Sequence, residues 1–354
     1  MGYDLEKTTT GSAHSVSSDQ DAGDLRAERP SQGSSYQAFF NIVCVVAGTG
    51  GWIGVAILVL SMSMSIYTGI LLVKCLYYNG HTRVASYQEV GAHAYGKWGL
   101  GAVWFFHTSV ILGVPVMFFI LSGTEISALT KDSVPGITKA AWIWICCCFV
   151  SIPFVLMKTL KEEAMRFPKS FNKVLAFAML FCCLMYALVA IPGYLTYGPS
   201  AKSPILSSLP ENASRKVATI MIIAHVLLAA PVLMTAFALE IERILSVTVE
   251  RRGRFGERIW RTLIRLGIMG VVGGIACLVP FFDSFLSLLG AFGNCMLIYV
   301  MPIGFYWKLI GWRTMKWYEL VWCGIVLVIG LLGCVIGSMD AIKALHRDFT
   351  QGRE

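Results

Sequence analysis

Long stretches without a single charged side chain constrain the fold of this chain more than any other feature of its sequence. Eight stretches contain no Asp, Glu, Lys or Arg, and they cover 30–73, 98–124, 140–157, 174–201, 217–239, 266–282, 284–307 and 320–339. Because about 20 apolar residues in a helix cross the hydrocarbon core of a bilayer, stretches of this length predict membrane-spanning helices. Only 14% of the 354 residues are charged, against about 25% in soluble domains. The predicted fold class is therefore an all-α polytopic membrane protein.

The first of these stretches decides the number of helices. Residues Ala38 to Tyr78 would form a helix roughly 60 Å long, close to two crossings, and the Gly-rich run at 48–51 is its only break. Two crossings give about nine transmembrane helices, and one crossing gives about eight. Residues 1–35 are rich in Ser, Thr, Asp and Gly, so they are predicted to be a disordered cytoplasmic tail without a cleavable signal peptide. The predicted transmembrane domain covers 36–345, and 346–354 is a C-terminal tail.

The distribution of Lys and Arg predicts the orientation. Basic residues gather in alternate loops, at 79–99, 158–170, 246–261 and 308–316, and basic loops are usually cytoplasmic. Asn212 begins the sequon Asn212-Ala213-Ser214 in a loop on the opposite side, and it is a glycosylation candidate. The same distribution explains the net charge of +8 without a nucleic acid partner. The lipid bilayer is the expected partner, and the oligomeric state is left open.

Ionisable groups within or at the ends of the apolar segments are the candidate functional residues, because such groups are costly in a membrane. Glu125, His225 and Glu240 are the candidates for proton transfer or gating. Each also has a simpler interpretation. Glu125 could reach the headgroups, His225 could be a hydrogen-bonded interior histidine, and Glu240 could lie at a solvated helix end. Alternatively, Glu240 forms a cytoplasmic gate with Glu242 and Arg243.

Motifs typical of enzymes and metal sites do not occur in this sequence. We find no Walker A motif, no HExxH, no GxSxG and no Cys/His spacing of a metal site. We therefore predict no enzyme activity, no metal site and no cofactor. The eleven cysteines are expected to be packing residues. The Gly-x-x-x-Gly pairs at 270/274 and 333/337 predict close packing of helices.

Three segments, in their order along the chain, resemble the amino acid/auxin permease family. Residues 41–50 resemble its first helix, in which an Asn precedes a Gly-x-Gly break. Residues 162–171 resemble the charged, Pro-containing segment before its seventh helix, and 279–302 resembles its ninth and tenth helices. The likeness covers nearly everything after Tyr36.

This resemblance implies a LeuT-like bundle with an inverted repeat, in which the substrate lies at the membrane midplane beside broken helices. It implies that Gly48, Thr49 and Gly50, together with Asn41, bind the substrate, because N–H groups of the broken first helix can hold an amino acid carboxylate. The implied function is secondary active transport of neutral amino acids by alternating access. The coupling ion is a proton, with Na⁺ as the alternative, and the membrane is the plasma membrane or the vacuolar membrane.

The sequence departs from the family pattern at two places. In the family a half-helix and a loop follow the Gly-x-Gly break, whereas here Gly50 runs directly into Gly51-Trp52. The fourth helix ends near Met157 and meets Glu162 almost at once, where the family has its fifth and sixth helices. The bundle is therefore expected to lack part of helix 1 and helices 5 and 6. The alternative function is a non-transporting membrane protein, either a nutrient sensor or an inactive truncated permease.

Overall fold

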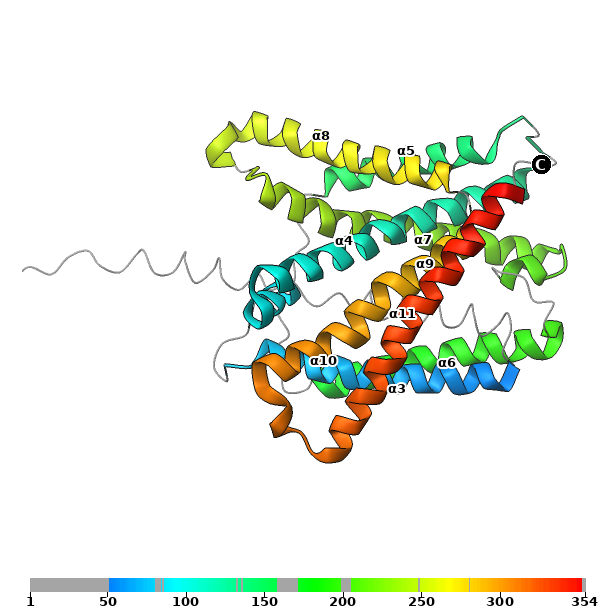
Figure 1. The fold of residues 1–354 in the computed structure, drawn as a ribbon. Coiled ribbons are helices and arrows are strands. Elements are labelled where there is room, and N and C mark those ends of the chain that lie inside the picture. The colour runs from blue at the N-terminus through cyan, green and yellow to red at the C-terminus, as the bar shows by residue number, and fades with distance from the viewer. Residues whose placement is uncertain are drawn as a thin grey trace, which may run out of the picture.

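The computed structural model describes residues 51–79, 84, 86–131, 133–134, 136–157, 171–198, 205–247, 249–279 and 281–351. All regular secondary structure in these residues is helical (Figure 1). The helices are α3 (Gly51–Leu76), α4 (Tyr87–Thr130), α5 (Lys139–Leu156), α6 (Phe171–Tyr197), η3 (Ile205–Ser208), α7 (Ala213–Ile244), α8 (Val249–Leu278), α9 (Phe282–Leu288), η4 (Leu289–Val300), α10 (Met301–Tyr306), η5 (Trp307–Gly311), η6 (Trp312–Thr314) and α11 (Trp317–Gln351).

Eight helical segments of the described residues are long and apolar enough to cross a membrane. Seven of them are α3 to α8 and α11, and the eighth runs continuously through α9, η4, α10, η5 and η6. The predicted all-α polytopic membrane fold is confirmed. The ninth crossing that the sequence allows would fall at 36–50, outside the described residues. The LeuT-like arrangement with its inverted repeat stays a prediction.

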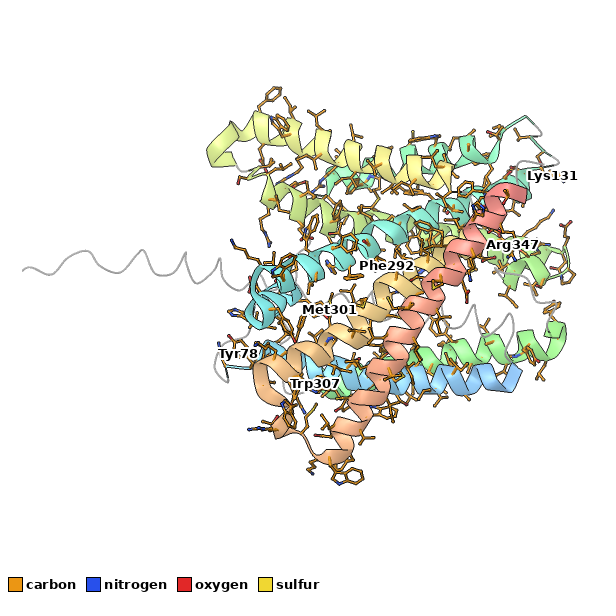
Figure 2. The ribbon with its side chains drawn as sticks, in the orientation of Figure 1. Tyr78, Lys131, Phe292, Met301, Trp307 and Arg347 are labelled. Atoms are coloured by element: carbon orange, nitrogen blue, oxygen red, sulfur yellow. The ribbon has the colours of Figure 1, made fainter. Side chains whose placement is uncertain are left out.

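The helix ends alternate between two ends of the bundle, as the sequence predicted from its loops. Figure 1 shows the start of α4, the start of α8 and the η5–η6 turn at one end, and the starts of α5 and α7 with the end of α11 at the other. Tyr78 and Trp307 mark the first end in Figure 2, and Lys131 and Arg347 mark the second. We call the first the basic end, because it carries the basic loops.

Two hydrophobic cores hold the bundle together, and α4 contributes to both. The first core joins α4, through Val103 and Val110, to α3, η4, α10 and α11. The second core joins α4, through Phe119 and Ile120, to α5, α7 and α8. Helix α6 packs against α3, where Cys183 meets Leu58. Helix α4 is therefore the central element of the described fold.

Two predicted loops are partly helical, which corrects the sequence analysis. Helix α4 begins at Tyr87, inside the predicted loop 79–99, and it bends at Tyr95 and Gly96, where Gly96 has a φ of 61°. Helix α8 begins inside the predicted loop 246–261 and bends at Gly253, with a φ of 69°. These first turns contain charged and polar residues, so an apolar-stretch criterion cannot detect them. At the other end of the chain, α11 continues past residue 345 to Gln351.

Candidate functional site

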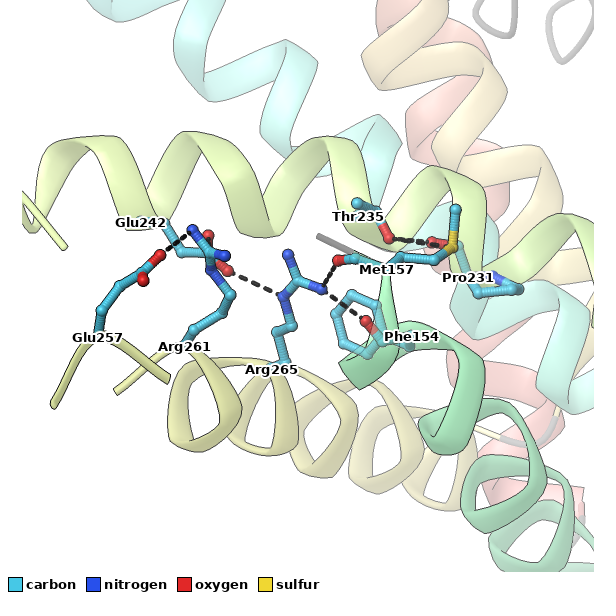
Figure 3. Close-up of polar contacts among 8 residues, drawn as sticks. All are labelled: Phe154, Met157, Pro231, Thr235, Glu242, Glu257, Arg261 and Arg265. Atoms are coloured by element: carbon cyan, nitrogen blue, oxygen red, sulfur yellow. Dashed lines mark hydrogen bonds and ion pairs between the residues drawn. The ribbon is translucent and has the colours of Figure 1, made fainter. Parts of the chain in front are cut away.

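A buried ion cluster joins α7 to α8 near the basic end (Figure 3). The Glu242 side chain is only 4% exposed, and each of its carboxylate oxygens accepts a hydrogen bond from an arginine of α8. The Nε atoms of Arg261 and Arg265 lie 2.9 Å from Oε2 and Oε1 respectively. Arg261 also pairs with Glu257, one turn earlier on α8, at 2.8 Å. Buried charges are usually paired, and here both Glu242 oxygens have arginine partners, whereas Nη2 of Arg265 has no hydrogen-bond partner among the described residues.

Arg265 extends this cluster to the end of α5. Its side chain has no exposed surface, and its Nη1 donates to the carbonyl oxygens of Phe154, at 2.7 Å, and of Met157. The guanidinium also lies 5.5 Å from the centre of the Phe154 ring. The last carbonyls of a helix have no partner within it, so Arg265 supplies the donor that α5 lacks. One side chain thus ties α5, α7 and α8 together.

The sequence offered a gate of Glu240, Glu242 and Arg243 as one interpretation. In the structure Arg243 is exposed on α7, and the partners of Glu242 are Arg261 and Arg265. A sequence signal for them exists, because Glu257, Arg261 and Arg265 follow one another at intervals of four residues. Residues four apart lie on the same face of a helix, so this spacing indicates a charged stripe on α8. Our search for isolated charges in apolar stretches missed it.

Glu240 has a different environment, although it lies only two residues from Glu242. Its buried carboxylate accepts a hydrogen bond from Nε2 of Gln88 at 2.6 Å. Gln88 belongs to the segment of α4 that precedes the bend at Gly96, so this bond fixes that segment to α7. Among the described residues, the hydrogen-bond partner of Glu240 is thus a neutral amide rather than a guanidinium.

The structure does not bring the three predicted ionisable candidates together. Glu240 lies toward the basic end, whereas Glu125 is buried toward the opposite end of α4, close enough to Arg215 for electrostatic interaction. His225 is exposed on the outer surface of α7, so it is not the interior histidine that the sequence suggested. His107 on α4 is half-buried, and its Nδ1 is buried and has no hydrogen-bond partner in the described part of the chain.

The predicted substrate-binding residues Asn41, Gly48, Thr49 and Gly50 lie outside the described residues. Helix α3 begins at Gly51, directly after them. Their assignment to substrate binding stays a prediction.

A polar group near the middle of the first core was not predicted. The Tyr299 hydroxyl in η4 lies 2.8 Å from the Ser61 hydroxyl and 3.3 Å from the Ser65 hydroxyl of α3. The Tyr87 hydroxyl donates to the carbonyl of Leu297 at 2.8 Å. These bonds attach η4 to α3 and α4. Neutral polar residues carry no charge signal, so a search for charged groups passes over them.

Asn212 is exposed and has a structural role. It is the N-cap of α7, and its Oδ1 accepts a hydrogen bond from the backbone N–H of Arg215 at 2.9 Å. This is the usual function of Asn before a helix. Glycosylation of Asn212 stays a prediction.

Eight apolar crossings, with a buried ion cluster and the buried amide of Asn294 between them, define an integral, multi-pass membrane protein with polar groups in its interior. The family model described as "Transmembrane amino acid transporter protein" matches residues 33–162 and 161–343. The chain therefore belongs to the transmembrane amino acid transporter family, which is a family of transporters and not of enzymes.

The chain is similar to several named transporters. It is 26% identical over 195 residues to a vesicular inhibitory amino acid transporter of Xenopus tropicalis, covering 53% of this chain and 37% of that protein. It is 22% identical over 393 residues to amino acid transporter AVT1B of Arabidopsis thaliana, covering 87% of this chain and 71% of the relative. It is 21% identical over 402 residues to a vesicular GABA transporter of Caenorhabditis elegans, covering 88% of this chain and 81% of the relative.

These matches bear on the expected missing helices. The family match falls into two segments that meet at residues 161–162, which is where the sequence predicts the loss of helices 5 and 6. The alignment with AVT1B is 393 residues long, although it includes only 87% of this 354-residue chain. It therefore contains positions at which the relative has residues and this chain has none. Both observations favour an internal shortening relative to these proteins.

Proposed function

We propose that this chain is a secondary active transporter that carries neutral amino acids in symport with protons by alternating access. Membership of the transmembrane amino acid transporter family carries this proposal. The name of one relative specifies GABA, an amino acid with no net charge at neutral pH, and this supports a neutral substrate. The buried carboxylates support proton coupling, because ionisable groups inside a membrane commonly serve ion and proton pathways.

The environments of the buried carboxylates separate their proposed roles. Glu242 has two guanidinium partners on α8, which hold α7 to α8, so we assign it a structural role. Glu240 has the neutral amide of Gln88 as its partner. Protonation would replace the charge-assisted bond between Gln88 and Glu240 with a weaker neutral one. In this proposal, proton binding at Glu240 releases the first segment of α4 from α7, and this movement contributes to gating at the basic end.

Transport in reconstituted vesicles tests this proposal. We would purify the full chain, reconstitute it into liposomes with an imposed pH gradient, and measure uptake of labelled alanine and GABA. Glu240→Gln should abolish uptake driven by the gradient and retain exchange between internal and external substrate, because exchange requires no net proton movement. Asp340→Asn is the matched control, since the Asp340 side chain is 69% exposed on α11.

Three results would contradict parts of the proposal. Equal gradient-driven uptake by Glu240→Gln and the wild type would remove Glu240 from the coupling mechanism. Uptake that follows a Na⁺ gradient instead of the pH gradient would identify Na⁺ as the coupling ion. Unchanged uptake by Gly50→Val would contradict the assignment of the Gly48–Gly50 break to substrate binding, which rests on sequence alone.

A non-transporting protein is the second candidate function, and the two-segment family match favours it. A shortened permease could bind an amino acid as a nutrient sensor, or it could be inactive. Thermal unfolding of the detergent-solubilised protein, measured with and without amino acids, separates these cases. A sensor shows stabilisation by an amino acid without uptake in vesicles, and an inactive permease shows neither. Fluorescence imaging of the tagged chain would decide between the plasma membrane and the vacuolar membrane.

A further inference from the structure

We propose that Asn294 binds a small polar solute in the interior of the bundle. The solute accepts a hydrogen bond from the amide Nδ2 and donates one to Oδ1. This inference rests on the proposed function, because we identify the solute with the transported amino acid. Asn294 lies in η4, and none of the substrate-binding residues predicted from the sequence lies in that helix.

The first observation is that the Asn294 amide is buried and unsatisfied. The side chain has no exposed surface, and neither Oδ1 nor Nδ2 has a hydrogen-bond partner in the described part of the chain. Buried polar groups are nearly always hydrogen-bonded in native proteins, and an unmade hydrogen bond in an apolar interior is costly. A bound solute that pairs with both atoms would remove this cost.

The second observation is the backbone that carries Asn294. Residues Leu289–Val300 form a π-helix, a rare conformation that occurs frequently at functional sites. Asn294 is near its middle, between Gly290 and Ile298 on the buried face. The tyrosine hydroxyl bonds that attach η4 to α3 and α4 lie farther along the same helix, so the π-helical segment is fixed to two neighbouring helices beyond Asn294.

The third observation is that η4 approaches α4 closely beside Asn294. A Cβ at Gly293 would lie 2.6 Å from Cγ2 of Val110, so only glycine fits at this contact. The rings of Phe106 and Phe292 lie 5.0 Å apart at the same contact, and Figure 2 labels Phe292 on the segment drawn between α4 and α11.

Further unpartnered polar atoms occur on α4 within one turn of this contact. Nδ1 of His107 and Oγ1 of Thr108 are buried and lack hydrogen-bond partners in the described residues. His107 is also close enough to Glu240, the proposed coupling residue, for electrostatic interaction. These unpartnered atoms therefore lie at the same level of α4 as its contact with η4.

The chemistry of the amide favours one class of solute. A simple cation would pair with Oδ1 and leave the Nδ2 donors of Asn294 unmatched, because an amide nitrogen cannot accept from or coordinate a cation. An amino acid offers a carboxylate to Nδ2 and an ammonium group to Oδ1. A bound water molecule offers the same donor and acceptor groups without being transported. The test must therefore separate an amino acid from a water molecule.

Asn294→Leu tests the proposal, because leucine has the same branched arrangement of four side-chain heavy atoms and cannot form hydrogen bonds. We would measure the melting temperature of the full chain in detergent with increasing alanine or GABA, and KM for uptake in the vesicles described above. Without amino acid, the variant should melt at or above the wild-type temperature, since the unsatisfied amide is gone. It should also lose stabilisation by the amino acid, and KM should rise about tenfold, as expected for a lost hydrogen bond to a charged group.

Control variants make the result specific. Ser338→Ala removes another buried, unpartnered hydroxyl, on α11, and it should change neither KM nor the stabilisation by amino acid. Asn294→Ser keeps one donor and one acceptor, and it should give an intermediate KM. If leucine prevents folding, Asn294→Ala takes its place, because alanine needs no additional space.

The outcomes distinguish this inference from the proposed function. Wild-type uptake with an unchanged KM in Asn294→Leu would overturn the inference alone, and it would leave a bound water as the partner of the amide. An amino acid that stabilises the wild type but not the variant, without any uptake, would support the inference and overturn transport. Neither uptake nor stabilisation in the wild type would overturn both.

Discussion

Arg265 is a charged side chain without exposed surface, and three acceptors hold it in place. Removal of the guanidinium would leave the Glu242 carboxylate with one arginine instead of two, and the last carbonyls of α5 without their donor. Breaking a buried ion pair typically costs about 3–5 kcal/mol. We expect Arg265→Met to lower the free energy of unfolding by about this amount, measured by thermal unfolding in detergent.

Arg258→Met is the matched control for this prediction. Arg258 lies on the same helix, is exposed, and has no ion pair among the described residues. Its substitution should leave the melting temperature within the range of ordinary surface changes. The double variant Arg265→Met with Glu242→Gln should recover part of the lost stability, because the unpaired charge is then removed. Equal melting temperatures for Arg265→Met and Arg258→Met would contradict the structural role of the cluster.

Individual residues show where sequence reasoning was limited. It singled out Glu125 and Glu240 as ionisable groups within or at the ends of apolar segments, and both are buried. It suggested an interior position for His225, and the structure places that side chain on the outer surface. Residue type and depth in an apolar stretch do not determine which face of a helix meets a neighbour. The importance of Asn294 depends on the absence of a partner, and a sequence contains no direct signal for that.

At the scale of elements, the bend in α4 depends on two glycines that lie against each other. A Cβ on Gly99 would lie 2.0 Å from the carbonyl oxygen of Gly91. Alanine at position 99 would therefore force apart the two parts of α4, and overpacking of this kind costs about 1–3 kcal/mol. It would also displace Gln88 from Glu240. We expect Gly99→Ala to lower the melting temperature clearly.

Gly101→Ala provides the comparison on the same helix. A Cβ at Gly101 would meet no atom within 4 Å, and replacing Gly by Ala in a helix usually stabilises it by about 0.5–1 kcal/mol. The Gly101→Ala protein should therefore melt at or slightly above the wild-type temperature. A Gly99→Ala protein as stable as the Gly101→Ala protein would show that the close contact across the bend does not form.

The elements were the most predictable level of this molecule. The apolar stretches predicted the crossings correctly, because length and hydrophobicity alone make a helix membrane-spanning. The glycine pairs were only half right. Gly337 packs against Ala291 as expected, but Gly270 and Gly274 contact no described neighbour, and Gly273 is the glycine that meets Trp144. The spacing shows that one face of a helix carries small residues. Tertiary packing decides whether a neighbouring helix packs against that face.

At the scale of the whole molecule, the alternation of loops predicts which end of the bundle is extracellular or lumenal. Asn212 lies at the end opposite the basic loops, so expression in a eukaryotic cell should attach a glycan to it. Treatment with a glycosidase should then reduce the apparent mass of the protein. An unmodified wild-type chain, or a glycan attached elsewhere, would contradict this orientation.

The capping role of Asn212 requires careful control variants. Ser214→Ala removes the sequon and keeps the Asn212 cap, and Asn212→Asp keeps an acceptor at the cap. Both should lose the glycan while their melting temperatures stay close to that of the wild-type protein after glycosidase treatment. Asn212→Ala loses the glycan and the cap together, and it should be less stable by about 1 kcal/mol.

The π-helix η4 also changes how this region should be compared with its relatives. Its i to i+5 hydrogen bonds place more residues in each turn than the i to i+4 bonds of an α-helix. Over the twelve residues of η4, the angular phase of the side chains drifts away from the 3.6-residue period. A helical wheel drawn from residue 282 with the 3.6-residue period would therefore assign residues 301–311 to the wrong faces of the helix. In a homologue that crosses the membrane here as a regular α-helix, residues at the same aligned positions would have different neighbours.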